Sequence, residues 1–415
     1  MVCLNLPPSE RYKLENVYLV GIIPGPKKTK NDQINRILTH LVDDLQTLWD
    51  PGFLIPTPSM PAGRKIRGAL IPLVCDLPGG NEVAGAPDHN ATKPCAYCEV
   101  TLASLDYVEE PFPPRICAKV LAHGESWRDA ETEDVRRNLE SQGGGRWSEL
   151  MRLSYWDPVS YKVLDTMHML LEGMGNRHCR KTWGMDPLRL DGDGQTLAPA
   201  IIQDPVRRTE CETVIRTGNR KQISDLGLET LRSLCVEREL PWGVVLGEKT
   251  LPKVWQHDAD VITPSWIGRA PKYAGTAGTG TLKADEWRNF LTISLVFSLP
   301  QQWLGAGERY QSLLENFMHL VACIEYASLR TISEKTIAAY EAHTLAYLRG
   351  HLRLFRGKVL SIYQHSSLHL PDFMRRFGPV HAWRAFPFER YNGIMHSINT
   401  NNKIGAIFFA GKYLC

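Results

Sequence analysis

An acid that follows a short apolar run is the first feature of this sequence that could do chemistry. Residues 68–75 (GALIPLVC) lead directly into Asp76, and a Leu-Pro-Gly-Gly turn follows at residues 77–80. A continuous apolar run bounded by Gly and Pro predicts a strand buried on both faces, as in the centre of an α/β sheet. Because an unpartnered buried carboxylate is costly, an acid at the carboxyl end of such a strand indicates a ligand or a metal ion. A plain Asp that begins a turn is the alternative.

The second candidate site is a Cys-x-x-Cys pair. Cys95 and Cys98 have a spacing that can chelate zinc through a tight turn, and His89, Cys117 or His123 could complete a tetrahedral set. One such pair supplies only half of the ligands, so a structural or redox pair is the alternative. We take Cys95, Cys98 and His89 as the candidate Zn²⁺ ligands.

Two further pairs of polar residues have helical spacing. Asp165 and His168 are three residues apart and would share one face of a helix, where they could bind or position a group together. A helix-capping acid beside a satisfied histidine is the alternative. His365 and His369 are four apart, a spacing that can hold a metal, but no Glu follows the first histidine. We interpret this second pair as helix-face or core histidines.

Composition places few limits on the partners. The 415 residues include 43% hydrophobic and 22% charged residues, which is ordinary for a soluble globular protein of two or three domains. A net charge of +3 neither proves nor excludes a nucleic-acid partner, because a local basic groove is what matters. Basic residues cluster at three places, each of which is a candidate DNA contact or a solvated face: Arg64, Lys65 and Arg67; residues 207–221; and residues 349–358.

Targeting signals and cysteine usage favour an intracellular location. No apolar segment approaches the ~18 residues that a membrane span needs. Residues 1–13 lack the basic region and the apolar core of a secretory signal. The ten cysteines are scattered through a long chain rather than densely spaced, which is typical of a reducing compartment. These features predict the cytosol or the nucleus.

The elements that would carry the candidate residues follow a strand, strand, helix, strand order. We expect strands at residues 1–6 and 16–23, a helix from about residue 31 to 50, and the strand that ends at Asp76. This order matches the middle of a ribonuclease-H-like core. Helical periodicity dominates from residue 186, in the segments 204–233, 283–299, 310–328 and 331–350. The predicted fold class is therefore α/β plus all-α, with an incomplete ribonuclease-H-like core and a large helical insertion.

Seven phrases, found in order along nearly the whole chain, resemble the transposases of the CACTA (En/Spm) superfamily, in particular a fungal lineage. They are LNLPPSERYKLENVYLVGIIPGPKK, IRGALIPLVCDLPGG, HNATKPCAYC, LDTMHMLLEGMGNRHCRKTWGMD, residues 263–268, KADEWRN and FPFERYNGIMHSINTNNKIG. The resemblance implies a DDE-type enzyme, an Asp-x-x-His signature and a helical insertion before the last catalytic acid. It also implies transposon-end DNA as the partner. We further expect the nucleus as the location and a homo-oligomer.

The resemblance assigns roles to individual residues. Asp76 looks like the second catalytic acid, Asp165 and His168 look like the signature, and Glu389 is our choice for the third acid, with a salt-bridged structural Glu as the alternative. Such acids hold two Mg²⁺ ions that activate a nucleophile and stabilise the leaving oxygen of a phosphodiester. The basic group before Asp76 and the cation next to Glu389 become candidate DNA contacts: Arg64, Lys65, Arg67 and Arg390.

The sequence departs from the family at its start. The family places its first catalytic Asp a few dozen residues before LNLPP, and this chain begins there. We therefore expect an N-terminally truncated, inactive transposase-derived protein. Two alternatives are a non-catalytic DNA-binding or interaction protein and an unrelated zinc enzyme that uses Cys95, Cys98 and His168. The predicted domains are the partial core with the Cys-x-x-Cys turn (1–125), the Asp-x-x-His segment (126–185), the helical insertion (186–375) and the return to the core (376–415).

Overall fold

The computed structural model describes residues 1–22, 33–185, 205–226, 230, 244–355 and 357–397. The chain divides into two compact units. Unit 1 comprises Met1–Gly173 and His319–Cys415, and unit 2 comprises Met174–Met318. Residues 319–375, which the sequence assigned to the helical insertion, therefore group with unit 1. None of the described helices is both long and apolar enough to span a bilayer.

The first residues of unit 1 form short helices where strands were expected. Val2 and Val17 make one isolated antiparallel bridge, and α1 (Pro8–Arg11) and η1 (Leu14–Asn16) lie between them. Pro7 and Pro8 favour this outcome, because proline cannot donate to a β-ladder but starts a helix well. The two predicted strands at the N-terminus are therefore reduced to a single bridge within the described residues.

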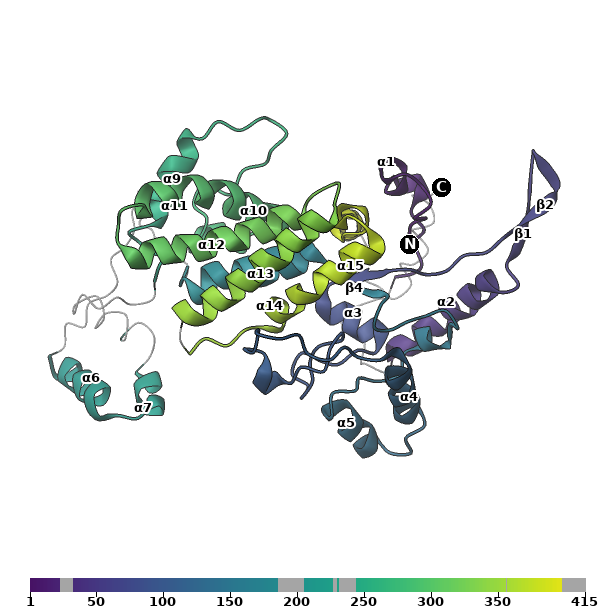
Figure 1. Cartoon of the computed structure of the whole chain (residues 1–415), viewed down its shortest axis with the longest axis horizontal. Helices are drawn as coiled ribbons and strands as arrows, with labels where there is room; N and C mark the ends of the chain where they lie inside the picture. Colours follow the sequence, from purple (N-terminus) through teal and green to yellow (C-terminus); the bar gives the residue numbers. More distant parts are fainter. Residues whose placement is uncertain (23–32, 186–204, 227–229, 231–243, 356, 398–415) are drawn as a thin grey trace. The chain divides into compact units, whose positions relative to one another are not determined.

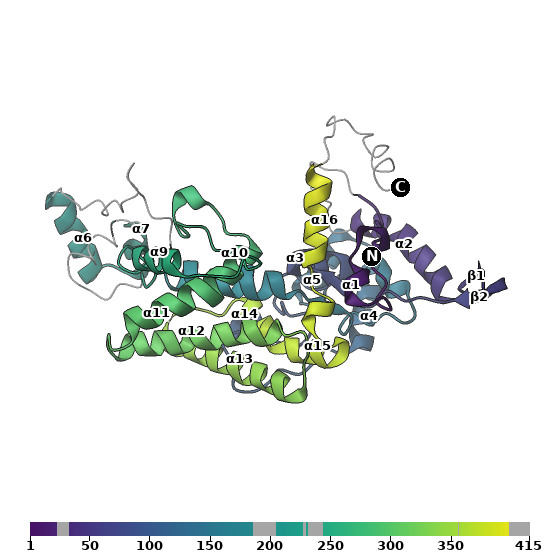
Figure 2. The ribbon, with the colours of Figure 1, turned by 90° about the horizontal axis from the view of Figure 1, so that it is seen from above.

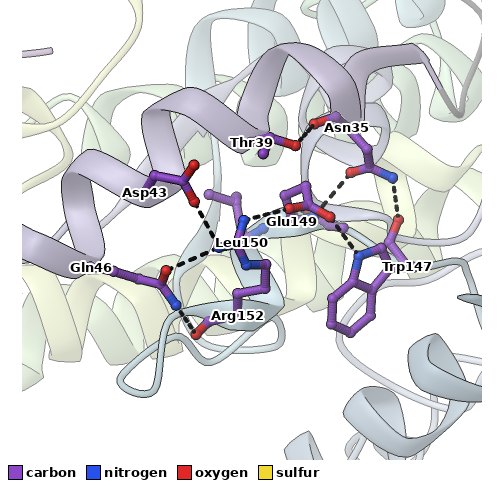
Figure 3. Close-up of polar contacts among 9 residues, drawn as sticks. Asn35, Thr39, Asp43, Gln46, Trp147, Glu149, Leu150 and Arg152 are labelled. Carbon is purple, nitrogen blue, oxygen red and sulfur yellow. Dashed lines mark hydrogen bonds and ion pairs between the residues drawn. The ribbon is translucent and has the colours of Figure 1, made fainter.

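The predicted first long helix is confirmed as α2 (Gln33–Trp49). It packs against the segment around residues 150–156. Val42 and Leu45 of α2 share a buried cluster with Leu150, Leu153 and Trp156. Polar contacts border this cluster, as Figure 3 shows: the Asn35 amide donates to the Trp147 carbonyl and accepts from the Glu149 N–H, and Arg152 pairs with Asp43. Helix α2 is thereby fixed to η3 (Glu149–Arg152).

Two pairs of strands are present among the described residues. β1 (Phe53–Thr57) and β2 (Met60–Ile66) form an antiparallel hairpin in a stretch where no strand was predicted from the sequence. β3 (Leu73–Cys75) pairs in parallel with β4 (Lys162–Leu164), so that the chain crosses over between them. β3 is half-buried rather than buried on both faces. The incomplete ribonuclease-H-like core remains a prediction.

Helices surround the β3–β4 pair in unit 1 (Figure 1). α3 (Leu77–Ala84) starts at the end of β3, and η4 (Met167–Gly175) is a π-helix that starts shortly after β4. α15 (Leu370–Phe377) packs against both β4 and α13 (Glu334–Leu354). The remaining elements are η2 (Leu102–Ser104), α4 (Cys117–Arg128), α5 (Glu133–Ser141), α14 (Ile362–Ser366), η8 (Ser367–His369), η9 (Val380–Ala382) and α16 (Phe386–Ser397).

The described part of unit 2 is helical, as its sequence periodicity predicts. Its core contains the fully buried aromatic side chains of Trp183, Trp287, Phe290 and Phe317. Its described elements are η5 (His178–Thr182), α6 (Pro205–Thr217), α7 (Arg220–Asp225), α9 (Leu251–Asp260), η6 (Ala277–Thr279), α10 (Ala284–Asn289), η7 (Phe290–Ser294), α11 (Leu295–Trp303) and α12 (Glu308–Ala327). The last residues of α12 belong to unit 1.

Candidate functional site

Two cysteines and two histidines from distant parts of the unit 1 sequence converge on one point. Cys95 and Cys98 lie in a loop after α3, His365 lies in α14, and His369 closes η8. The Sγ and imidazole nitrogen atoms of these four residues all lie within 4.8 Å of one another. We call these residues, Cys95, Cys98, His365 and His369, the Cys/His cluster. Three of its four members are buried.

The spacing of the donor atoms fits a tetrahedral zinc ion. Zn–S and Zn–N bonds of about 2.3 and 2.05 Å place S and N donors about 3.5 Å apart and two N donors about 3.3 Å apart. Cys95 Sγ lies 3.4 Å from His369 Nε2, and Cys98 Sγ lies 3.2 Å from His365 Nε2. The two Nε2 atoms are 3.3 Å apart. The donor types and distances therefore match a closed Cys₂His₂ structural site.

Electrostatics favour one thiolate in the cluster even without a metal. Burial opposes ionisation of Cys95, but the hydrogen bond from Cys98 and the charge of His369 outweigh burial and hold the Cys95 pKa well below its usual value. The pKa of the Cys98 thiol is raised because it donates to Cys95 and is itself buried. Because zinc ligands must be deprotonated, a bound cation would replace this shared proton.

Neighbouring residues hold the Cys-x-x-Cys turn in place. The buried Arg115 guanidinium donates to the carbonyls of Cys95, Lys93 and Gly143. The buried Lys162 ammonium on β4 donates to the Tyr97 hydroxyl at 3.2 Å and lies 5.0 Å from the centre of its ring. The turn is thus attached to the strand that precedes Asp165.

The other candidate zinc ligands lie elsewhere. His89 is exposed and pairs with Asp88 at 3.1 Å, so it does not join Cys95 and Cys98. Neither Cys117 nor His123 belongs to the Cys/His cluster. The pKa of Cys117 is raised to about 11 by burial and by Asp157.

His365 and His369 were interpreted from the sequence as helix-face or core histidines, and the structure instead places them beside the cysteine pair. The signal was present in the sequence as two half-sites, Cys-x-x-Cys and His-x-x-x-His. Because most of the chain separates Cys98 from His365, spacing alone could not pair the two half-sites.

Asp165 links two segments of unit 1 by hydrogen bonds. Its buried carboxylate uses both oxygens: Oδ1 accepts the Ala385 N–H at 2.8 Å, and Oδ2 accepts the His168 N–H at 3.0 Å and faces His168 Nδ1 at 2.7 Å. Asp165 therefore connects the start of η4 to the residue that immediately precedes α16. The Asp-x-x-His signature is thus observed as an ion pair rather than as a pair of open ligands.

Asp165 also orients the His168 ring. Its Nδ1 faces Asp165, and its Nε2 lies 3.9 Å from the Glu172 carboxylate. Burial lowers the His168 pKa, but the hydrogen bond and charge of Asp165, together with the charges of Glu172 and Asp76, outweigh it and raise the pKa above its ordinary value. The imidazolium form of His168 is therefore favoured in this acidic surrounding.

Asp76 follows β3 directly, as predicted, and it also caps a helix. Asp76 Oδ1 accepts the Gly79 N–H at 3.0 Å at the start of α3, which is the ordinary role of an N-cap acid. Its carboxylate has no ion-pair partner among the described residues. Asp76, Asp165, His168 and Tyr363 line one small cavity of about 10 Å³, the size of a single water site.

Glu389, near the far end of the described chain, acts electrostatically on Glu172. Burial raises the Glu172 pKa, His168 opposes this, and the carboxylates of Glu389, Asp165 and Asp76 raise it further. Asp76 and Glu389, which are far apart in the sequence, therefore act on the same side chain. The exposed Glu389 carboxylate has no ion-pair partner among the described residues.

The N-terminal segment holds the helix that carries Glu389. The Arg11 guanidinium and the Tyr12 hydroxyl both donate to the Ala382 carbonyl, at 2.8 and 2.6 Å. The Tyr391 hydroxyl of α16 donates to the Tyr12 carbonyl. Figure 2 shows α16 rising beside the N-terminal residues. Glu389 therefore lies on a helix that the N-terminal segment contacts both just before its start and at Tyr391.

The candidate DNA contacts lie on two separate elements of unit 1. Arg64, Lys65 and Arg67 lie on or next to β2, and Arg390 lies on α16 next to Glu389. All four side chains are exposed. Arg67 pairs with Asp50, whereas the exposed side chains of Arg64, Lys65 and Arg390 are open to solvent or to a nucleic acid.

Comparison with known families gives an independent indication. Residues 1–111 match the model of transposase family tnp2. This tnp2 match covers α1 to the Cys-x-x-Cys turn, including Asp76, and supports a transposase origin for the chain. No curated protein matches the chain.

Proposed function

We propose that this chain is a transposase-derived DNA-binding protein whose acidic site is of the DDE type. The observation that carries the proposal is that Asp76 and Glu389 both raise the pKa of Glu172, whose carboxylate lies 3.9 Å from His168 Nε2, in a chain whose N-terminal part matches transposase family tnp2. CACTA-type ancestry, as the sequence phrases imply, is part of this proposal. Transposon-end DNA is the corresponding partner.

We propose that the carboxylates of Asp76 and Glu389 bind a divalent cation of the Mg²⁺ type. Asp76 and Glu389 are oxygen donors without ion-pair partners among the described residues, and their like charges disfavour the ionised form of Glu172. A bound Mg²⁺ would offset this repulsion, because hard cations prefer carboxylate oxygens. When bound, the cation would supply activation of a nucleophile and stabilisation of the leaving oxygen in phosphodiester cleavage.

Asp165 and His168 serve this site by positioning. Asp165 holds the residue before α16 and so sets where Glu389 lies, and the favoured imidazolium of His168 places a positive charge beside Glu172. Arg390, exposed on the same helix as Glu389, would contact a DNA phosphate near the acids. The Cys/His cluster, once loaded with zinc, would fix α14 and η8 to the loop that follows α3.

In this proposal, Asp76 and Glu389 fill two of the three acid positions that the resemblance implies. We therefore expect the purified chain to bind duplex DNA in a salt-dependent way and to show no robust Mg²⁺- or Mn²⁺-dependent nicking. The assay compares the wild type with Asp76→Ala on a supercoiled plasmid. Robust nicking abolished by Asp76→Ala would overturn the expected inactivity, and absence of any DNA binding would overturn the proposed function.

A further inference from the structure

The β1–β2 hairpin is a strongly exposed feature of unit 1. Every residue of both strands is exposed except the half-buried Gly63. The apolar side chains on the strands are exposed to degrees that are unusual for strands: Phe53 46%, Leu54 66%, Ile55 47%, Met60 47% and Ile66 39%. Both faces of the hairpin are thus available for a partner.

Charge on the hairpin has one sign. Between Asp50 and Asp76 the sequence contains no acid, and its three charged residues are Arg64, Lys65 and Arg67. Arg67 pairs with Asp50 at 2.7 Å. Among the described residues, neither Arg64 nor Lys65 has an ion-pair partner. A surface with free cations and no acids is complementary to a polyanion.

The register places these cations on opposite faces. Leu54 lies opposite Lys65, and Ile55 lies opposite Arg64. Because successive side chains of a strand point to opposite faces, each face carries one cation beside an apolar side chain. A ribbon with a cation on each face can contact negatively charged surfaces on both of its sides, as in a groove of a polyanion. It is less suited to lie flat against one protein surface.

The hairpin is poorly suited to pair with another strand. Pro56 in β1 and Pro61 in β2 lack the N–H that a further strand would need, and proline at sheet edges blocks edge-to-edge association. A third proline, Pro58, lies in the turn, where the Thr57 hydroxyl accepts the Met60 N–H at 3.2 Å. These prolines argue against a second copy of the chain as the occupant through strand pairing.

We propose that the β1–β2 hairpin inserts into the major groove of duplex DNA, with Arg64 and Lys65 contacting phosphates on either side. The major groove admits a two-stranded ribbon, and the apolar side chain on the face that meets the bases would contact thymine methyl groups. A strand of seven residues, the length of β2, is about 24 Å long, which spans most of a helical turn of DNA. This inference rests on the proposed DNA-binding function and assigns that binding to one element.

The test measures DNA affinity of the full zinc-loaded chain by fluorescence anisotropy with a duplex of about 30 base pairs, over salt concentrations of about 50–200 mM. The double variant Arg64→Ala/Lys65→Ala should bind at least about tenfold more weakly at about 0.1 M salt, with the slope of log K against log salt reduced by about 2. The matched control is Lys13→Ala/Arg137→Ala, which removes two exposed cations already paired with Glu10 and Asp134. The control should retain wild-type affinity and slope.

A second variant tests the apolar contacts and the rival occupant. Leu54→Ser/Ile55→Ser should weaken DNA binding while the molar mass measured by light scattering stays that of the wild type. Either of two results would overturn the proposal: unchanged DNA affinity in both hairpin variants, or a lower oligomeric mass with unchanged DNA affinity, which would make the hairpin a surface for a second copy. Wild-type DNA binding must be present in either case, and its absence would instead count against the proposed function.

Discussion

Asp165 uses both of its carboxylate oxygens inside the protein, and this distinguishes it from Asp76 and Glu389. Its partners are the Ala385 N–H, the His168 N–H and the His168 ring. A buried carboxylate that is fully hydrogen-bonded stabilises the fold, whereas a carboxylate without an ion-pair partner is available to a cation. At the residue scale, Asp165 therefore positions neighbouring residues of unit 1, whereas Asp76 and Glu389 could bind a cation.

The raised His168 pKa predicts how the stability contributed by the Asp165–His168 pair depends on pH. A histidine whose folded pKa lies above its unfolded value contributes stability that is complete below the unfolded value, about 6.5, and is lost as pH rises through the folded pKa. Asp165→Asn should therefore lower the free energy of unfolding by about 3 kcal/mol near pH 6 and by clearly less near pH 9. Denaturant titrations of zinc-loaded, magnesium-free protein measure this difference.

The control for that prediction is Asp43→Asn, which breaks the exposed ion pair with Arg152. Such pairs contribute about 0–1 kcal/mol, and no comparable pH trend is expected. An Asp165→Asn loss that is equal at both pH values would show that the ion pair with His168 does not stabilise the fold.

At the scale of elements, long helices were predicted well and short strands poorly. The periodicity of α2, α12 and α13 extends over several turns, so local pattern alone determines these helices. The hairpin was missed because its prolines indicate a loop and its exposed strands lack the alternation of a half-buried sheet. The N-terminal strands were overpredicted because apolar runs near Pro7 and Pro24 lack a partner strand among the described residues.

The candidate site was predictable in parts. Asp76 was placed correctly at the end of a strand, because an apolar run followed by an acid is a local signal. The partners of Cys95 and Cys98 were not, because they come from α14 and η8 after most of the chain has intervened. Glu172 was overlooked, although it follows His168 by four residues, a spacing that places two side chains on one face of a helix.

A bound zinc ion should link α14 and η8 to the Cys95–Cys98 loop and thereby stabilise unit 1. With free zinc at about 1,000 times its Kd, the gain over the metal-free protein is about 4 kcal/mol. Cys98→Ser should lose the stoichiometric zinc measured by elemental analysis and this part of the free energy of unfolding. The buried Cys323, which contacts Thr344 outside the Cys/His cluster, provides the control Cys323→Ser. Full zinc retention in Cys98→Ser would contradict the assignment.

At the scale of the whole molecule, distant parts of the sequence meet in unit 1. The tnp2 match covers residues 1–111, and this part supplies Asp76 and the cysteines, whereas the C-terminal part of unit 1 supplies both histidines and Glu389. Unit 2 is inserted between them in the chain. The proposed metal-dependent DNA site requires that Asp76 and Glu389 serve one cation-binding site.

Binding of Mn²⁺, a paramagnetic substitute for Mg²⁺, tests that requirement most directly. Electron paramagnetic resonance titrations of the zinc-loaded chain should show that Asp76→Asn and Glu389→Gln each weaken Mn²⁺ binding by at least about tenfold, or about 1.4 kcal/mol. Glu133→Gln, which removes an exposed acid of α5, should bind Mn²⁺ like the wild type. Wild-type Mn²⁺ affinity in either Asp76→Asn or Glu389→Gln would contradict a shared site.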